Sequence, residues 1–171
     1  MDEAMAILLL EGRLEGLAVE AHARALLDIP RVVALEASRV RGPRFLRDGA
    51  AMRQATRVWL PGELRVLVLY HPAQYPLARA LMTVHPSAEL WYAAPEPERV
   101  DAHPEAEELR SHDRAARDRA VGVLAVTGSE VDDGPLQARL AELEVISSRA
   151  FVPQARLRGG WAVRKGLMRG G

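Results

Sequence analysis

The sequence contains no cysteine, a single lysine and no long hydrophobic run. The missing cysteines exclude disulfides and thiolate metal sites, and they leave the redox compartment undecided. A membrane helix needs roughly 18 consecutive apolar residues, and no run of that length occurs. The first apolar stretch follows Asp2 and Glu3, whereas a secretory signal begins with basic residues. We therefore expect no transmembrane segment, and a cytoplasmic location is the default expectation.

The charges balance, with 23 basic and 23 acidic residues and a formal net charge of zero. This balance lacks the basic excess of a general nucleic-acid binder, so no specific nucleic-acid binding is expected. Lys165 is the only lysine, which is typical of a GC-rich genome, so a single arginine is weak evidence for a phosphate site. The 49% hydrophobic and 27% charged composition indicates a soluble globular protein.

Apolar runs typical of strands alternate with segments of helical spacing along most of the chain. This alternation predicts an α/β fold: one doubly wound, mainly parallel sheet with helices on both faces, which is a Rossmann-like arrangement. Residues 37–63 are expected to form a connecting or lid segment that ends in a short strand. Within it, an irregular helix with Gly49 inside it is expected to carry Phe45, Leu46, Ala50, Met52 and Ala55. Strands are expected at 6–10, 31–35, 58–60, 66–70, 89–94 and 121–126, and helices at 17–28, 77–84, 104–119 and 136–143.

The chain shows no internal repeat and no long linker. We therefore expect a single Rossmann-like domain over residues 1–155. Residues 156–171 are basic and rich in glycine, with no acidic residue. They are interpreted as a C-terminal tail, either a flexible terminus or a surface-docking arm.

The stretch 65–82 predicts a central strand, a polar turn and a helix. The turn at the carboxyl end of a parallel strand is the usual ligand site of such folds. His71 in this turn is the catalytic candidate, either as a general base or as a hydrogen-bond donor, with a turn histidine bonded to backbone as the alternative. Tyr70 and Gln74 are candidate ligand-binding residues beside it.

Three other expected strand ends carry polar residues that belong at the same edge. Glu11 and Gly12 follow the first strand, Pro95-Glu96 follows the strand at 89–94, and Thr127 and Ser129 follow the last. Thr127 and Ser129 are candidates to bind an anion through backbone N–H groups and a hydroxyl, or they form a turn or helix cap. The pair at 132–133 offers carboxylates for a divalent cation, but the adjacent Gly-Pro favours an exposed turn.

Complete catalytic and cofactor motifs are missing. The sequence has no G-x-G-x-x-G, no P-loop, no H-E-x-x-H and no G-x-S-x-G, and its histidines lack metal-ligand spacing. No metal and no cofactor is therefore expected, and a hydrolase triad finds no support.

The order of elements resembles the amino-terminal, acceptor-side Rossmann-like domain of a GT-B glycosyltransferase. Residues 7–12 and 31–36 are similar to the family's first βαβ unit, and 66–72 to its middle strand. Residues 114–129 and 136–152 resemble the strand ending in serine and the helix leading to the interdomain crossing. The resemblance implies a transferase domain that binds a sugar or lipid acceptor and depends on a separate donor-binding domain, which this sequence lacks. On the acceptor side it implies roles for His71, Ser129 and Glu11.

Two alternatives stay open. One is a non-catalytic Rossmann-like binding or oligomerisation module, such as a homodimer, which the apolar patches around Trp59 and Trp161 suggest. The other is a degenerate toprim-like domain, because residues 9–15 and 32–34 resemble the opening of that family. The toprim family places a D-x-D motif after its next strand, where this chain has Tyr70-His71-Pro72.

Overall fold

The structure is a computed structural model that describes residues 3–10, 17–37, 40–128 and 130–146. Its centre is a five-stranded sheet in the order β2-β1-β3-β4-β5, in which every neighbouring pair is parallel. This confirms the expected α/β class with one parallel sheet. The strands are β1 (Ala4–Leu10), β2 (Val32–Glu36), β3 (Glu63–Leu69), β4 (Glu89–Ala93) and β5 (Gly122–Leu124).

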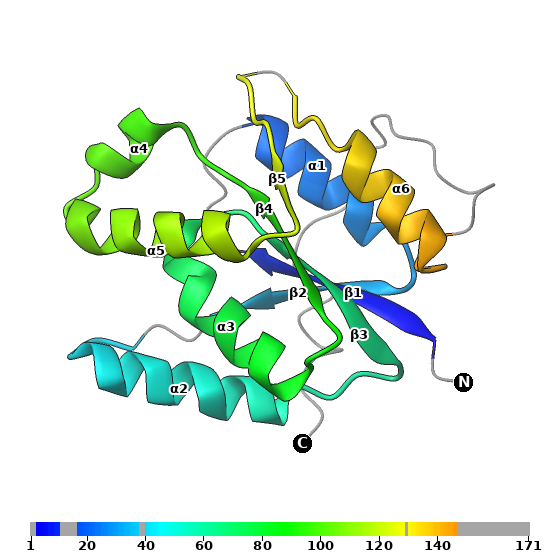
Figure 1. The fold of residues 1–171 in the computed structure, drawn as a ribbon, viewed down its shortest axis with the longest axis horizontal. Helices are drawn as coiled ribbons and strands as arrows, with labels where there is room; N and C mark the ends of the chain where they lie inside the picture. Colours follow the sequence, from blue (N-terminus) through cyan, green and yellow to red (C-terminus); the bar gives the residue numbers. More distant parts are fainter. Residues whose placement is uncertain (1–2, 11–16, 38–39, 129, 147–171) are drawn as a thin grey trace.

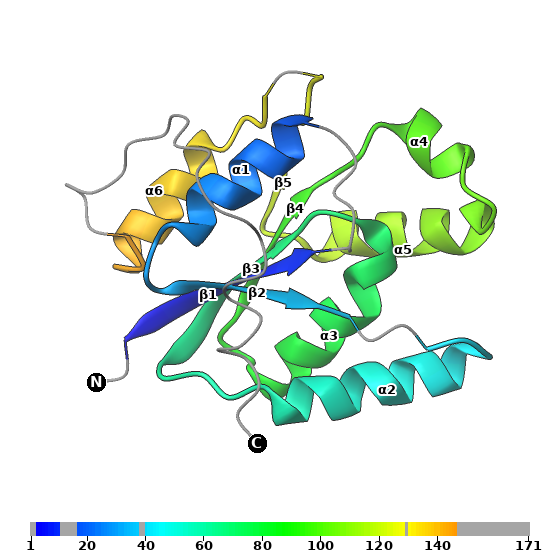
Figure 2. The same cartoon turned by 180° about the vertical axis from the view of Figure 1, so that it is seen from behind.

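Helices cover both faces of the sheet, as Figures 1 and 2 show from opposite sides. α1 (Leu17–Leu27) and α6 (Gly134–Glu142) lie side by side on one face. The other face carries α2 (Arg44–Arg57), α3 (Tyr75–Val84) and α5 (Ala106–Arg119), with the short α4 (Pro97–Asp101) before α5 and a 3₁₀ turn, Pro72–Gln74, before α3. Across the described ranges, no helix has the length and apolar character needed to cross a membrane.

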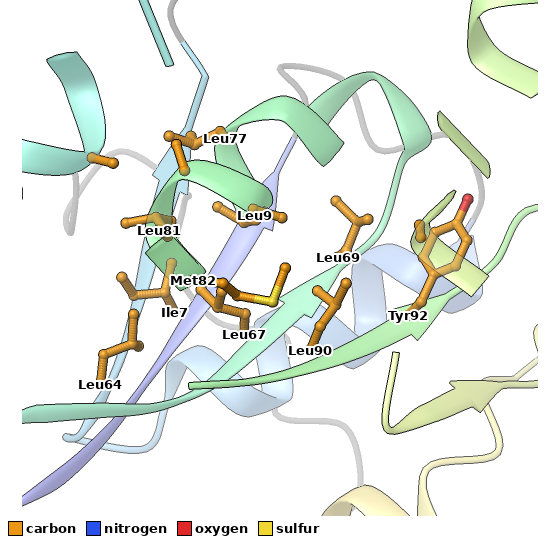
Figure 3. Close-up of a cluster of buried hydrophobic side chains, with 14 of the residues drawn as sticks. Ile7, Leu9, Leu64, Leu67, Leu69, Leu77, Leu81, Met82, Leu90 and Tyr92 are labelled. Atoms are coloured by element: carbon orange, nitrogen blue, oxygen red, sulfur yellow. The ribbon is translucent and has the colours of Figure 1, made fainter. Parts of the chain in front are cut away.

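The two helical layers produce two apolar cores, because successive strand residues point to opposite faces of the sheet. Ile7, Leu67 and Leu69 belong to the core under α2, α3 and α5, where Leu81 and Tyr92 meet them (Figure 3). The alternate strand positions, Leu8 and Val68 among them, pack against α1 and α6 in the second core. Burial on both faces explains why β1 and β3 are continuous apolar runs.

The winding of the chain reverses between β1 and β3. The helix that follows β1 packs on one face, and the helix that follows β3 packs on the other. Such a switch point leaves a crevice at the carboxyl ends of the two strands, where open α/β sheets usually hold ligands. The predicted strand-end site therefore corresponds to the carboxyl ends of β1 and β3.

Some local predictions were wrong. Residues 58–60 form no strand, because α2 ends at Arg57 and Trp59 is 62% exposed instead of paired in the sheet. The helix expected in the connection between β2 and β3 is present, but it is regular: the 14-residue α2 is the crossover helix between these strands. The helix expected at 104–119 begins at Ala106, after a separate α4, and the strand at 121–126 shortens to the three residues of β5.

Replacing Gly62 with alanine is expected to lower the free energy of unfolding by about 1–3 kcal/mol. An added Cβ would lie 2.1 Å from the backbone oxygen of Glu3, which also accepts the hydrogen bond from the Glu63 amide. Because the obstacle is backbone, β1 and β3 must separate at this end. Urea denaturation followed by circular dichroism measures the change.

Gly49→Ala is the matched control for Gly62→Ala. Gly49 lies inside α2, and the nearest atom to an added Cβ is 3.6 Å away at the end of the flexible Arg53 side chain. Alanine is the better helix former, so this variant should gain about 0.5–1 kcal/mol. Equal effects of the two substitutions would contradict the close approach at Gly62.

Candidate functional site

His71 begins the turn after β3, at the switch-point edge. Its Nδ1 accepts a hydrogen bond from the Ala73 amide at 3.1 Å, so the ring caps the 3₁₀ turn. An accepting Nδ1 carries no proton, and the neutral ring therefore has its proton on Nε2. Of the two roles expected for His71, this geometry favours the hydrogen-bond donor over the general base.

His103 repeats this arrangement in the connection between α4 and α5. Its Nδ1 accepts from the Glu105 amide at 3.1 Å, which again leaves the proton of a neutral ring on Nε2. The His71 and His103 rings lie edge to face, with centroids 6.5 Å apart. Two turns far apart in sequence thus place a pair of N–H donors at one edge of the molecule. No sequence signal joins the two residues.

Gln74 and Tyr70, the two ligand-binding candidates near His71, both have internal partners. Gln74 is 5% exposed, and its Oε1 accepts a hydrogen bond from the Ala37 amide at 2.9 Å, which ties the 3₁₀ turn to the chain leaving β2. Tyr70 is 4% exposed and its hydroxyl meets His22 of α1. Gln74 thus joins its turn to the chain after β2, and Tyr70 joins the end of β3 to α1.

The remaining candidates are only partly described. Glu11, Gly12 and Ser129 lie outside the described residues. Thr127 closes a turn on Glu130, since its amide and hydroxyl both contact the Glu130 carbonyl and its hydroxyl accepts the Glu130 amide. These hydrogen bonds favour a turn, the second of the two predictions for this segment, over an anion-binding site.

A buried polar chain joins α1, β3 and α6. Tyr70 lies 2.8 Å from Nδ1 of His22, and Nε2 of His22 lies 3.1 Å from Asp133 Oδ2, which also accepts from Gln137 at 2.6 Å. A carboxylate can only accept, so in the neutral ring Nε2 donates to Asp133 and Nδ1 accepts from the tyrosine hydroxyl. The order of donors runs from Tyr70 through His22 to Asp133.

Electrostatics determines the charge states of Tyr70 and Asp133, the two ends of this hydrogen-bonded chain. Burial, reinforced by the charge of Asp133, raises the pKa of Tyr70 well above its usual value, so the phenol keeps its proton. Partial burial by itself raises the pKa of Asp133, but hydrogen bonds from His22 and Gln137 outweigh it and lower the pKa overall. The order of groups is that of a hydrolytic triad, yet the buried Tyr70 hydroxyl has no access to a substrate. The chain is a structural clamp.

A solvent-open cavity of about 530 Å³ lies where α2 and α5 begin. Arg47 of α2 contacts Glu108 of α5 at 2.7 Å and joins the two helices beside it. Three carboxylates and one guanidinium give the lining a formal charge of −2, which disfavours phosphate and other anions. The lining residues are Arg44, Pro104, Glu105, Glu107, Glu108, Ser111 and His112.

His112 is the most informative residue of this cavity. It is 8% exposed, and its Nδ1 has no hydrogen-bond partner among the described residues. Its ring tilts against Tyr75 at the start of α3, with centroids 6.2 Å apart. Burial lowers the pKa of His112 and Glu108 opposes this only in part, so the ring is neutral at pH 7. A buried polar atom without a partner is energetically costly, and this sets His112 apart from the other residues that line the cavity.

His103 directly precedes the lining residue Pro104 and lies against the His71 ring, but neither histidine lines the cavity. Of the other sequence-predicted site residues, the structure gives Tyr70, Gln74 and Thr127 internal contacts. Sequence reasoning missed His112 because it lies in a helix segment, 104–119, that is rich in charged residues. Its apolar spacing with Leu109 and Ala116 on the buried face of α5 was the available signal.

No protein-family model, curated protein or solved structure matches this chain. The assignment of the candidate site therefore rests on the geometry of the described residues.

Asp133→Asn is expected to lower the free energy of unfolding by about 1–3 kcal/mol at pH 7, because it removes the charged end of the buried chain. The pKa of Asp133 is lowered in the folded state. Its contribution to stability is therefore complete above the carboxyl pKa of the unfolded chain, about 3.9, and is lost as the pH falls through the lower folded value. Urea denaturation between pH 7 and pH 3 should show a shallower acid loss in the variant.

Asp132→Asn is the control, since Asp132 is the exposed neighbour of Asp133. It should leave both the stability at pH 7 and the acid profile within about 0.5 kcal/mol of the unaltered protein. An acid profile unchanged in Asp133→Asn would contradict the assignment of the clamp.

Proposed function

We propose that this chain is the acceptor-side α/β domain of a GT-B-type glycosyltransferase and that its cavity binds a neutral, polyhydroxylated acceptor. The exposed polar side chains that line the cavity carry the proposal, because Glu105, Glu107 and Ser111 can each accept a hydrogen bond from a ligand hydroxyl. The element order resembling GT-B transferases supports the same assignment. The sugar donor would be held by a separate domain or protein.

The composition of the cavity supports a sugar rather than a nucleotide. Each sugar hydroxyl both donates and accepts, so carboxylates, a guanidinium, a serine hydroxyl and a neutral imidazole can all bond to it. The net negative lining at Glu105, Glu107 and Glu108 repels phosphate groups. His103, which directly precedes the lining residue Pro104, carries its N–H donor next to this side of the cavity.

A second candidate function is a non-catalytic docking module. The apolar side chains exposed along α2 favour it, since exposed apolar side chains that gather on one surface mark interaction sites. This function does not compete for the cavity, because a protein can bind an acceptor and also dock on a surface.

The acceptor proposal predicts that glucose or N-acetylglucosamine shifts backbone amide signals of residues 104–112 in an NMR titration of the full chain. Dissociation constants on the order of 1 mM, about −4 kcal/mol, are expected for a small ligand in an open cavity. UDP, which adds negative charge, should leave these signals in place. A titration in which no sugar moves signals of 104–112 would refute the acceptor site.

Ser111→Ala should weaken sugar binding about three- to tenfold, the value of one hydrogen bond. Ser87→Ala is the matched control, because Ser87 is also exposed but lies in the turn between α3 and β4, outside the cavity lining. Equal sugar affinities for the two variants would show that binding occurs elsewhere. Circular dichroism of both variants checks that the fold is retained.

A further inference from the structure

Exposed apolar side chains gather along α2. Phe45, Met52 and Trp59 are spaced seven residues apart and are 71%, 37% and 62% exposed, and Leu46 beside them is 44% exposed. Seven residues are close to two helical turns, so Phe45 and Met52 share a face of α2, and Trp59 follows just past its end. We call these four residues the α2 stripe. They are four of the seven large hydrophobic side chains exposed in the described part of the chain.

The stripe lies in the most basic described segment. Residues 40–60 hold five arginines and one aspartate, a formal charge of +4, although the whole chain is neutral. Arg41, Arg44, Arg53 and Arg57 are exposed, whereas Arg47 is turned toward Glu108 of α5. The combination of an aromatic and aliphatic face with flanking arginines is typical of helices that lie in a membrane interface.

The position of α2 suits a flat partner. Ala51 and Ala55 are buried against the core on another side of the helix, and Figures 1 and 2 show α2 along the margin of the molecule. Within the helix, Phe45 and Met52 are separated by about 10 Å along the axis. A stable protein interface buries roughly 800 Å² on each partner, which four side chains on one convex helix do not supply. A lipid surface needs only a few inserted side chains and favourable charge.

A second copy of the chain is less suited than an anionic lipid surface to cover the α2 stripe, for electrostatic reasons. Pairing two α2 helices would place two segments of charge +4 against each other, and like charges in contact oppose association. An anionic surface reverses the sign of that interaction. We propose that α2 docks this protein peripherally on anionic lipid bilayers, with Phe45, Met52 and Trp59 inserted among the headgroups and the flanking arginines against acidic phosphates.

Vesicle co-sedimentation of the full chain tests this docking. At low salt the protein should sediment with vesicles of equal parts phosphatidylglycerol and phosphatidylcholine and remain in solution with phosphatidylcholine alone. Added salt should release it, because screening weakens the arginine contribution. Phe45→Ser with Trp59→Ser, and separately Arg53→Gln with Arg57→Gln, should each reduce binding by a factor on the order of ten or more.

Val121→Ser is the matched control, because Val121 is 62% exposed like Trp59 but lies beside β5. It should bind anionic vesicles like the unaltered protein. Failure of that protein to sediment with anionic vesicles at low salt would overturn the proposal. So would a dimer seen by sedimentation velocity and abolished by Phe45→Ser with Trp59→Ser, since a second copy would then cover the stripe. Equal loss of binding in Val121→Ser would also overturn it.

The sugar titration separates this proposal from the acceptor site. Ser111→Ala affects the cavity and leaves the α2 stripe intact, whereas Phe45→Ser with Trp59→Ser does the reverse. Vesicle binding without sugar binding would support docking alone, and sugar binding without vesicle binding would support the acceptor site alone.

Discussion

The parallel alignment of all five strands is the constraint on which the other features depend. It requires a crossover between successive strands, and the crossovers place helices on both faces of the sheet. It also brings every strand's carboxyl end, and the start of each helix that follows, to one edge of the molecule. The His71 turn and the cavity between α2 and α5 share that edge for this reason. Neither group would be near the other in an antiparallel sheet with short hairpins.

The same constraint explains which parts were predictable from sequence. A strand buried on both faces has to be apolar throughout, so residues 66–70 identified β3 without any homologue. The apolar run at 58–60 gave the same local signal but lies at the end of α2, outside the sheet. A three-residue apolar run does not distinguish a strand from a helix exit, because both place such residues near a core.

The buried clamp and the candidate site were less predictable, since their members come from separate segments. His22 and Asp133 are 111 positions apart and meet only because α1 and α6 cover the same face. His71 and His103 likewise meet across two helices and a strand. Spacing within one element reveals a buried face, but partners across elements depend on the order of strands in the sheet. Position in the turn after β3 singled out His71, whose role stays a prediction, while the cavity depends on where α2 and α5 begin relative to each other.

The strand order also has a consequence for synthesis of the chain. β1 is made before both of its partners, β2 and β3, and β3 ends at Leu69. Until that residue has left the ribosome, β1 presents an almost wholly apolar strand with one unpaired edge. Parallel pairing across two crossovers closes slowly compared with a hairpin. The nascent chain is therefore prone to aggregation between the synthesis of β1 and that of β3, and this is the stage at which a chaperone would bind it.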